Sequence, residues 1–221
     1  RVVMFKDGSD KVTKVLPYSA IESDDPEDLW SFLSEYEEKT GGEVLAIPHN
    51  PNVSNGLMFA PERLNGSKLT AAYAKLRSRW EPVLEVTQVK GDSEAHPLLS
   101  PTDEFADFET WDLKNIAGSA DKEDWMLQYE YARPALKLGL QFEQKLGVNP
   151  FRFGMIGSTD SHTSLATADD NNYFGKFPIE RPSPERATSV NAPFYENWRL
   201  TASGYAAVWA HENTREGIFT A

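Results

Sequence analysis

Cysteine is absent from this sequence of 221 residues. Without it there can be no disulfide, no thiolate-bound zinc and no cysteine nucleophile. A metal ion would therefore have to be held by His, Asp, Glu or Asn side chains. The sequence also lacks any apolar run approaching the ~20 residues that span a bilayer, and no secretory signal peptide is visible. We accordingly expect no membrane span, and the lack of cysteine suits the cytoplasm and a periplasm equally.

Positive charge is scarce. Lysine and arginine together number 22 against 34 aspartates and glutamates, which gives a net charge of −12. We therefore expect no nucleic-acid partner, because phosphate backbones are bound by Lys and Arg. A phosphorylated small molecule stays compatible with this charge, since a bound metal ion can reverse the local sign. Several familiar motifs are missing as well, namely the G-x-S-x-G elbow, the P-loop, His-Glu-x-x-His and the dinucleotide fingerprint.

Helical and strand patterns alternate along the chain. Asp25 followed by Pro26 and further acids predicts a helix start, and the apolar run 44–47 predicts a buried strand. The same order recurs as a helix over 69–80, a strand over 82–86, a helical pattern over 124–146 that Pro134 should kink or split, a strand over 151–156, a strand candidate at 206–210 and a helix capped by Asn213 or Thr214. This alternation indicates a single α/β domain over 1–221 with mostly parallel strands.

Residues 163–200 differ from the rest of the chain. They are rich in Asn, Pro, Ser and charge and show little periodicity. A loop of this length inside a compact domain is usually functional or disordered. Its aromatic residues indicate partial packing, so we interpret 163–200 as a long loop or lid within the domain.

The stretch GSTDSHTS places Asp160 and His162 directly after an apolar strand. Residues two apart on a strand point the same way, so both side chains could reach one ion. Oxygen and imidazole ligands suit Zn, Mn or Fe, and Ser161 could orient the ligands. The alternative is an ordinary polar turn with a capping Asp.

His49 follows the strand 44–47 in the segment AIPHNPNVSNG. Ligands gather at the carboxyl ends of parallel strands, so His49 should meet Asp160 and His162 at one rim. The neighbouring Asn50, Asn52 and Asn55 could orient a ligand or bind substrate. The alternative is an Asn- and Pro-rich turn in which the histidine is incidental.

Five further residues are weaker candidates. Glu85 lies in an apolar strand, so it is either an outward-facing charge or a site residue that needs a partner. His96, with Glu94 nearby, fits a solvated loop better than a site. His211 precedes the last predicted helix; it could be a residue of the capping region, or it could bind an anion together with Arg215.

Three strand ends, AIPHNP, VLEVTQ and GSTDSH, resemble the second half of the polymerase and histidinol phosphatase (PHP) superfamily. The longer stretches TGGEVLAIPHNPNVSNGLMF and VWAHENTREGIF look like a related uncharacterised bacterial family, a domain of unknown function. The resemblance implies part of a distorted TIM-like barrel with outer helices and a two- or three-metal cluster that hydrolyses phosphate esters. His49, Asp160 and His162 match the metal ligands of that family. The early His-x-His strand is missing, so we expect the C-terminal portion of a longer protein.

We therefore expect a metal-dependent hydrolase, foremost a phosphoesterase, acting on a small anionic or phosphorylated molecule. Divalent Zn, Mn or Fe would be its cofactor. One alternative is a non-catalytic module that binds carbohydrate or another ligand on a degenerate barrel. Another is a half-barrel that self-associates through the surface left by a missing N-terminal part, because open sheet edges seek partners.

Overall fold

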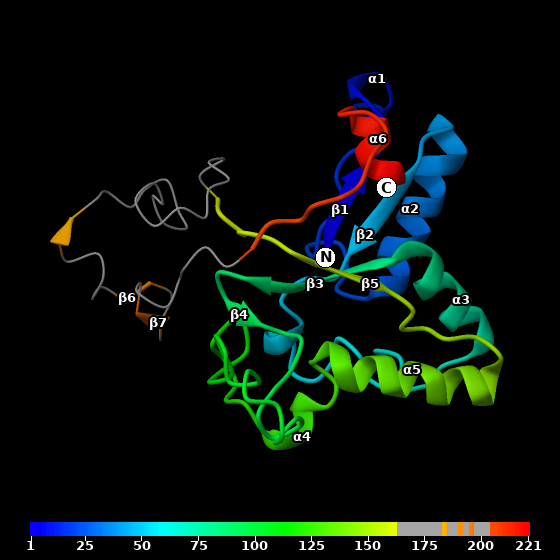
Figure 1. Cartoon of the computed structure of the whole chain (residues 1–221). Helices are drawn as coiled ribbons and strands as arrows, with labels where there is room; N and C mark the ends of the chain where they lie inside the picture. The colour runs from blue at the N-terminus through cyan, green and yellow to red at the C-terminus, as the bar shows by residue number, and fades with distance from the viewer. Residues whose placement is uncertain (163–182, 185–189, 192–194, 197–203) are drawn as a thin grey trace.

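The computed structural model describes residues 1–162, 183–184, 190–191, 195–196 and 204–221 (Figure 1). Its strands form small sheets. β1 (Val2–Phe5) pairs antiparallel with β2 (Val44–Ile47). β3 (Val83–Gln88) lies between β4 (Gly91–Asp92), which is antiparallel to it, and β5 (Gly154–Gly157), which is parallel. The short strands β6 (Val190–Asn191) and β7 (Tyr195–Glu196) pair with each other.

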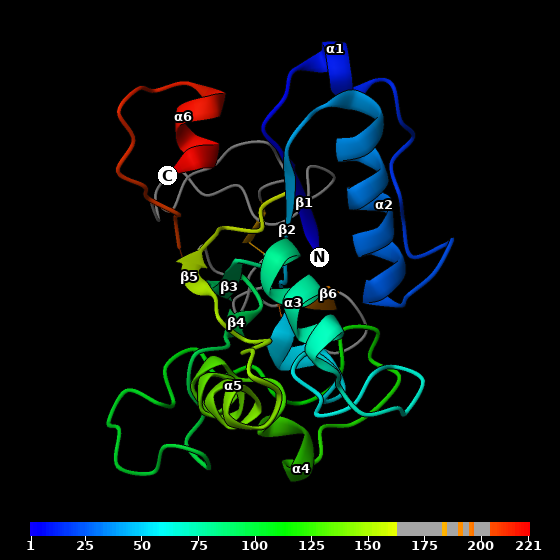
Figure 2. The same cartoon turned by 90° about the vertical axis from the view of Figure 1, so that its right-hand side faces the viewer.

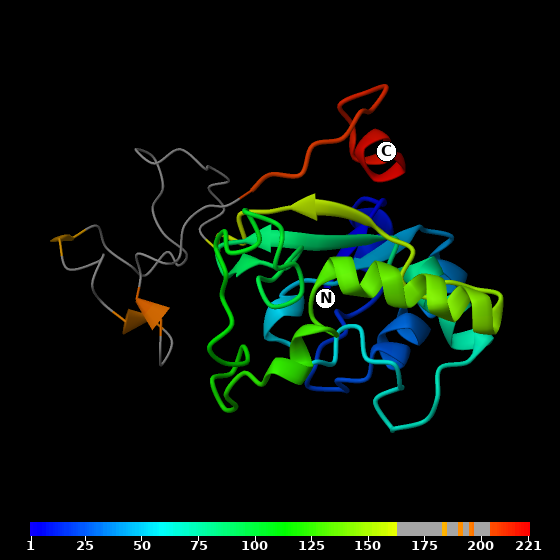
Figure 3. The same ribbon diagram turned by 60° about the horizontal axis from the view of Figure 1, so that its bottom comes forward.

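Helices pack beside these strands. They are α1 (Ser9–Val12), α2 (Pro26–Thr40), the 3-10 turn η1 (Pro51–Val53), α3 (Ala71–Trp80), α4 (Asp124–Leu127), α5 (Ala132–Leu146) and α6 (Arg215–Thr220). Figure 2 shows α2 alongside β1 and β2, while Figure 3 shows α5 to one side of β3 and β5, running in about the same direction as these strands. Among the described residues, no helix has the length and apolar character needed to cross a bilayer.

The predicted helix start at Asp25 is confirmed. Its carboxylate accepts a hydrogen bond of 2.9 Å from the Glu27 N–H, and Pro26 occupies the first turn of α2. The helix ends at Gly41 with a φ of 63°, a left-handed conformation that glycine adopts without strain. Capping at both ends thus fixes α2 locally, and its buried face presents Trp30, Leu33 and Tyr36 to the core.

One apolar core joins the helices to both sheets. Fully or nearly fully buried side chains from α2, β2, α3, β3, α5 and two connecting segments meet there. They include Trp30, Leu33, Tyr36, Val44, Ala46, Phe59, Trp80, Leu84, Ala135 and Phe151. The two main sheets are linked by the Glu85 N–H, which donates to the Pro48 carbonyl over 3.1 Å. This link brings the end of β2 against the middle of β3.

The expected barrel is wrong. Among the described residues the strands make separate sheets of two or three strands, and only β3 and β5 pair in parallel. The first strand β1 runs antiparallel to β2, which a barrel of parallel strands does not allow. Alternating helix and strand patterns indicate the type of each element but not which strands pair. The pattern therefore did not justify the prediction of a mostly parallel sheet.

Two local expectations have opposite outcomes. The break expected in 124–146 is confirmed, since α4 ends at Leu127 and α5 begins at Ala132, with Pro134 in its first turn. The strand expected at 206–210 is wrong, because this segment is exposed and extended without any ladder partner among the described residues. Thr214, one of the two capping residues named, does cap α6 by accepting from the Gly217 N–H at 3.0 Å.

Candidate functional site

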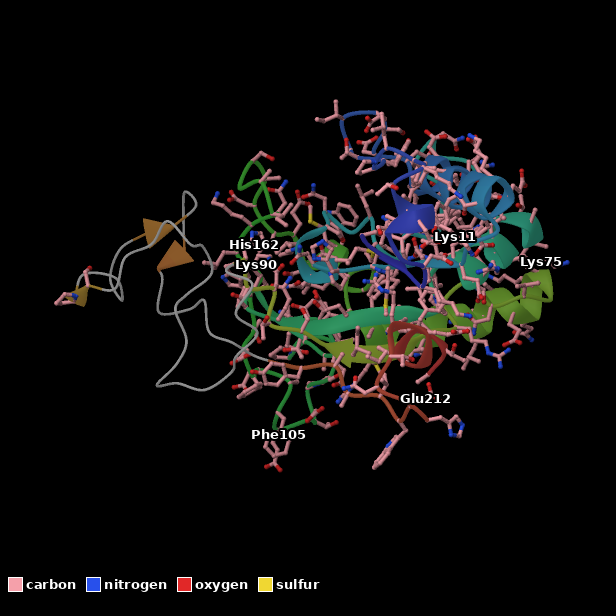
Figure 4. The ribbon with its side chains drawn as sticks, turned by 90° about the horizontal axis from the view of Figure 1, so that it is seen from above. Lys11, Lys75, Lys90, Phe105, His162 and Glu212 are labelled. Carbon is pink, nitrogen blue, oxygen red and sulfur yellow. The ribbon has the colours of Figure 1, made fainter. Side chains whose placement is uncertain are left out.

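Polar side chains converge where β2, β3 and β5 end. We call His49, Glu85, Lys90, Asp160 and His162 the rim cluster. His49 follows β2, Glu85 lies within β3, Lys90 lies in the turn after β3, and Asp160 and His162 follow β5. Figure 4 shows Lys90 and His162 together at this end of the sheet. The convergence follows from the parallel β3–β5 pairing and from the contact between β2 and β3.

Glu85 is the buried carboxylate of the rim cluster, only 6% exposed. Its Oε2 accepts a hydrogen bond of 2.5 Å from the Ser158 hydroxyl. Its Oε1 lies 3.9 Å from His49 Nδ1 and has no hydrogen-bond partner among the described residues. Burial raises the pKa of Glu85 above its usual value, and the charge of Asp160 adds to this rise. The Ser158 hydrogen bond, the nearby Gln88 amide and the charge of Lys90 oppose it. A buried oxygen without a partner is costly, so this atom points to a ligand or a proton.

Asp160 is held between two nitrogen groups. Its Oδ2 forms an ion pair with Lys90 Nζ, and its Oδ1 lies 3.4 Å from His162 Nε2. The Asp160 backbone has a φ of 47°, in the left-handed region that non-glycine residues seldom adopt. Strained backbone of this kind clusters at functional sites.

Asn50 connects His49 to the turn after β3. Its amide Nδ2 lies 3.0 Å from His49 Nδ1, and its Oδ1 accepts a hydrogen bond from Gln88 Nε2. Gln88 Oε1 in turn accepts from the Lys90 N–H over 2.8 Å. This chain of contacts orients the imidazole and fixes where Lys90 leaves the backbone.

Sequence reasoning missed Lys90. A lysine in a polar turn is ordinary, and only its place two residues beyond the end of β3 could have indicated a role. The structure brings it to Asp160, 70 residues away in the sequence.

The other two asparagines contribute no side chain to the rim cluster, although Asn52 contacts the Lys90 backbone. Asn52 is 1% exposed, and its Nδ2 donates to the carbonyls of Lys90 (2.9 Å) and Trp111 (3.0 Å). Asn55 has a φ of 57°, and its buried Oδ1 has no hydrogen-bond partner among the described residues. Asn52 thus tethers the Lys90 turn from inside the protein, and its predicted contact with substrate stays a prediction.

His96 and Glu94 form a separate group. His96 Nε2 lies 2.9 Å from Asp112 Oδ2, and its ring packs edge-on against Tyr131. Glu94 pairs at the surface with Arg133 over 2.9 Å. Within the described part of the chain, neither residue forms a hydrogen bond or ion pair with the rim cluster.

His211 and Arg215 lie near the opposite end of β2. Arg215 Nη1 donates to the Asp7 carbonyl over 3.3 Å, and Asp7 in turn accepts from the Glu43 N–H just before β2. Both His211 and Arg215 are exposed. Their predicted anion site is therefore separate from His49, whereas Ser161 stays in the Asp160 turn, where its N–H donates to Thr159 Oγ1 over 3.2 Å.

The described residues test the predicted loop and the predicted metal cluster only in part. Most of the loop or lid predicted over 163–200 falls outside them. Within them, no three His, Asp or Glu side chains are arranged to hold a metal ion as they stand. Asp160 is engaged by Lys90 instead, which is the contact that a metal ion would have to replace.

Comparison with known proteins gives one match. The family model described as Protein of unknown function (DUF3604) covers residues 1–221. No curated protein and no solved structure matches the chain. The PHP resemblance is therefore wrong as a family assignment, because the model that matches is not a PHP model. Strand-end motifs of about six residues are too short to specify a superfamily on their own.

Proposed function

The chain belongs to the DUF3604 family of proteins of unknown function, and we propose that it is a hydrolase dependent on a divalent metal ion at the rim cluster. Phosphate esters are the substrate class to test first. The observation that carries the proposal is Glu85 Oε1, a buried carboxylate oxygen with no hydrogen-bond partner among the described residues. It faces His49 and stands beside the Asp160 turn.

The donor chemistry suits a divalent ion. His49, Asp160 and His162 supply imidazole and carboxylate groups, which Zn, Mn and Fe accept. These groups come from the ends of two strands, and Asn50 already orients the His49 ring from behind. Asp160 would have to exchange Lys90 for the metal ion. Bound there, a divalent ion supplies Lewis-acid polarisation of a phosphoryl oxygen and lowers the pKa of a coordinated water.

The chain's own side chains have distinct tasks in this proposal. Glu85 Oε1 accepts a proton from the attacking water, since it is the carboxylate oxygen without a hydrogen bond to give up. Ser158 holds the other oxygen of Glu85 and so fixes the direction of Oε1. Gln88 and Asn50 keep the His49 ring in place.

One observation favours a second function, the binding of a carbohydrate. A cavity of about 390 Å³ lies between α3, α4 and the 56–66 segment, and Trp125, Tyr73 and Tyr129 line it together with Arg63 and Arg77. Trp125 is 51% exposed there. Amphipathic aromatic rings with charged neighbours suit ligands that are apolar on one face and polar at the edge. This function needs no metal ion.

The test is elemental analysis of the purified protein together with hydrolysis of para-nitrophenyl phosphate. We expect Zn, Mn or Fe near one equivalent in the wild type. The Asp160→Ala, His162→Ala double variant should lose both metal and activity while its melting temperature stays close to that of the wild type. The His211→Ala variant is the matched control, because it removes an exposed histidine away from the rim cluster. Metal content equal in the wild type and the double variant would contradict the proposal.

A further inference from the structure

The backbone of Lys90 is held on both sides. Its N–H donates to Gln88 Oε1 over 2.8 Å, and its carbonyl accepts from Asn52 Nδ2 over 2.9 Å. Asn52 is buried, and its Oδ1 also accepts from the Ser93 hydroxyl over 2.9 Å. The turn after β3 is therefore built around a fixed Lys90 position, from which only the side chain can move.

The side chain of Lys90 is largely buried although it carries a charge. The Lys90 side chain is 12% exposed and that of its partner Asp160 is 14% exposed. Two carboxylates, Asp160 and Glu85, act on this one ammonium, which gives the rim cluster its cation. A lysine that only served solubility would not be enclosed in this way, since Lys is seldom buried without a specific partner.

The ammonium and a divalent ion compete for the same carboxylate. Both are cations, so their joint occupation of Asp160 is opposed by like-charge repulsion that is strong away from bulk water. A metal ion bound to Asp160 therefore displaces Lys90 Nζ. Because the Lys90 backbone is fixed, the displaced ammonium stays at the rim, where an anion can neutralise it.

We propose that Lys90 is the anion-binding residue of the rim cluster, and that Asp160 releases it when a divalent metal ion binds. The inference rests on the proposed function and deepens it, because it assigns a phosphate-class anion as the group that the site receives. Lysine is a compact point charge suited to phosphate oxygens. Without metal the Lys90–Asp160 ion pair closes the site to anions; with metal, Lys90 turns to the substrate.

This exchange makes the two ligands cooperative. Metal binding frees the ammonium for phosphate, and phosphate binding removes the competitor of the metal ion. Coupling of this kind is reciprocal, so each ligand must raise the affinity for the other by the same factor. Factors of roughly 5–150 are usual for coupled sites.

The experiment is calorimetric titration of Mn²⁺ alone, inorganic phosphate alone, and each in the presence of the other. It compares the wild type with Lys90→Gln, Lys90→Arg and Lys75→Gln. The last is the matched control, since Lys75 is an exposed lysine on α3 and its loss changes the net charge equally. Thermal unfolding establishes that each variant is folded.

We expect Lys90→Gln to bind Mn²⁺ more tightly, by about tenfold, because the competitor for Asp160 is gone. The same variant should bind phosphate less tightly in the presence of Mn²⁺, also by about tenfold, and its coupling factor should fall toward one. Lys90→Arg keeps the charge and should retain the coupling. Opposite signs for the two ligands are the signature, because a merely structural lysine would weaken both.

Two failures are distinguishable. If the wild type binds Mn²⁺ but Lys90→Gln binds it more weakly, or keeps the full coupling factor, the Lys90 inference is overturned while the metal site stands. If the wild type fails to bind Mn²⁺ at millimolar concentration, the proposed function is overturned, and the inference that rests on it is overturned too.

Discussion

Two buried carboxylates in this protein have similar burial and different surroundings. Glu130 accepts hydrogen bonds at Oε1 from the N–H groups of Ser54 (3.1 Å) and Gly56 (2.9 Å), and its Oε2 pairs with Lys122 Nζ at 2.5 Å. Glu85 has Ser158 on one oxygen and no hydrogen-bond partner on the other among the described residues. Burial raises the pKa of both. Burial alone therefore does not identify a site; Glu130 differs from Glu85 in that both of its oxygens have a hydrogen-bond or ion-pair partner.

The largest expected effect on stability comes from removing the cation that pairs with Glu130. Lys122→Met leaves Glu130 buried without its cation and should lower the free energy of unfolding by about 3–5 kcal/mol. The matched change Lys114→Met removes a lysine from an exposed pair with Asp121 and should cost no more than about 1 kcal/mol. Urea unfolding of the two variants measures the difference. Equal effects would mean that Glu130 does not depend on Lys122.

A second prediction concerns Glu81, another buried carboxylate, which forms ion pairs with Arg1 and Arg77. Burial by itself would raise its pKa, but the charges of Arg1 and Arg77 outweigh burial and hold the pKa below its usual value of 4.5. An acid with a lowered folded pKa contributes stability above the unfolded pKa and loses it as the pH falls. The wild type should therefore be more stable than Glu81→Gln at pH 7, and this gap should close as the pH falls below about 4.5.

Thermal unfolding across that pH range measures the gap. The control is Glu35→Gln, which alters an exposed pair with Lys39 and should show a small gap at every pH. A Glu81 gap that widened on acidification would contradict the direction of the shift.

The smallest expected effect on stability comes from replacing Glu85, the carboxylate of the rim cluster. Glu85→Gln removes a buried charge that has one oxygen without a hydrogen-bond partner among the described residues, so the free energy of unfolding should change by less than about 1 kcal/mol or rise. Hydrolysis should nevertheless fall by about 10²–10⁴-fold, as expected when a general base is lost. Metal content should be retained. A stability loss as large as that of Lys122→Met would place Glu85 with the structural carboxylates.

Local features were predictable because neighbouring residues determine them. Asp25 and Pro26 specify the start of α2 through capping and a fixed φ, and Pro134 specifies the first turn of α5. These signals act over a few residues and need no knowledge of the rest of the fold. The strand patterns behind β2, β3 and β5 were equally local, and so were the polar residues that follow them.

Long-range features were not predictable. The antiparallel pairing of β1 with β2 depends on which edges meet in space, so the expected parallel barrel was wrong. The contact of Lys90 with Asp160 joins residues 70 apart and has no sequence signal of its own. Glu85 could be read as an outward-facing charge or as a site residue, because the period of a strand shows only that its side chains alternate.

Anomalous X-ray diffraction from crystals of the protein soaked in Mn²⁺ tests the central claim most directly. The account predicts an anomalous peak within coordination distance of the Asp160 and His49 side chains, with Lys90 Nζ moved away from the Asp160 carboxylate. A map without a peak there, with Lys90 still paired to Asp160 in the presence of Mn²⁺, would contradict it.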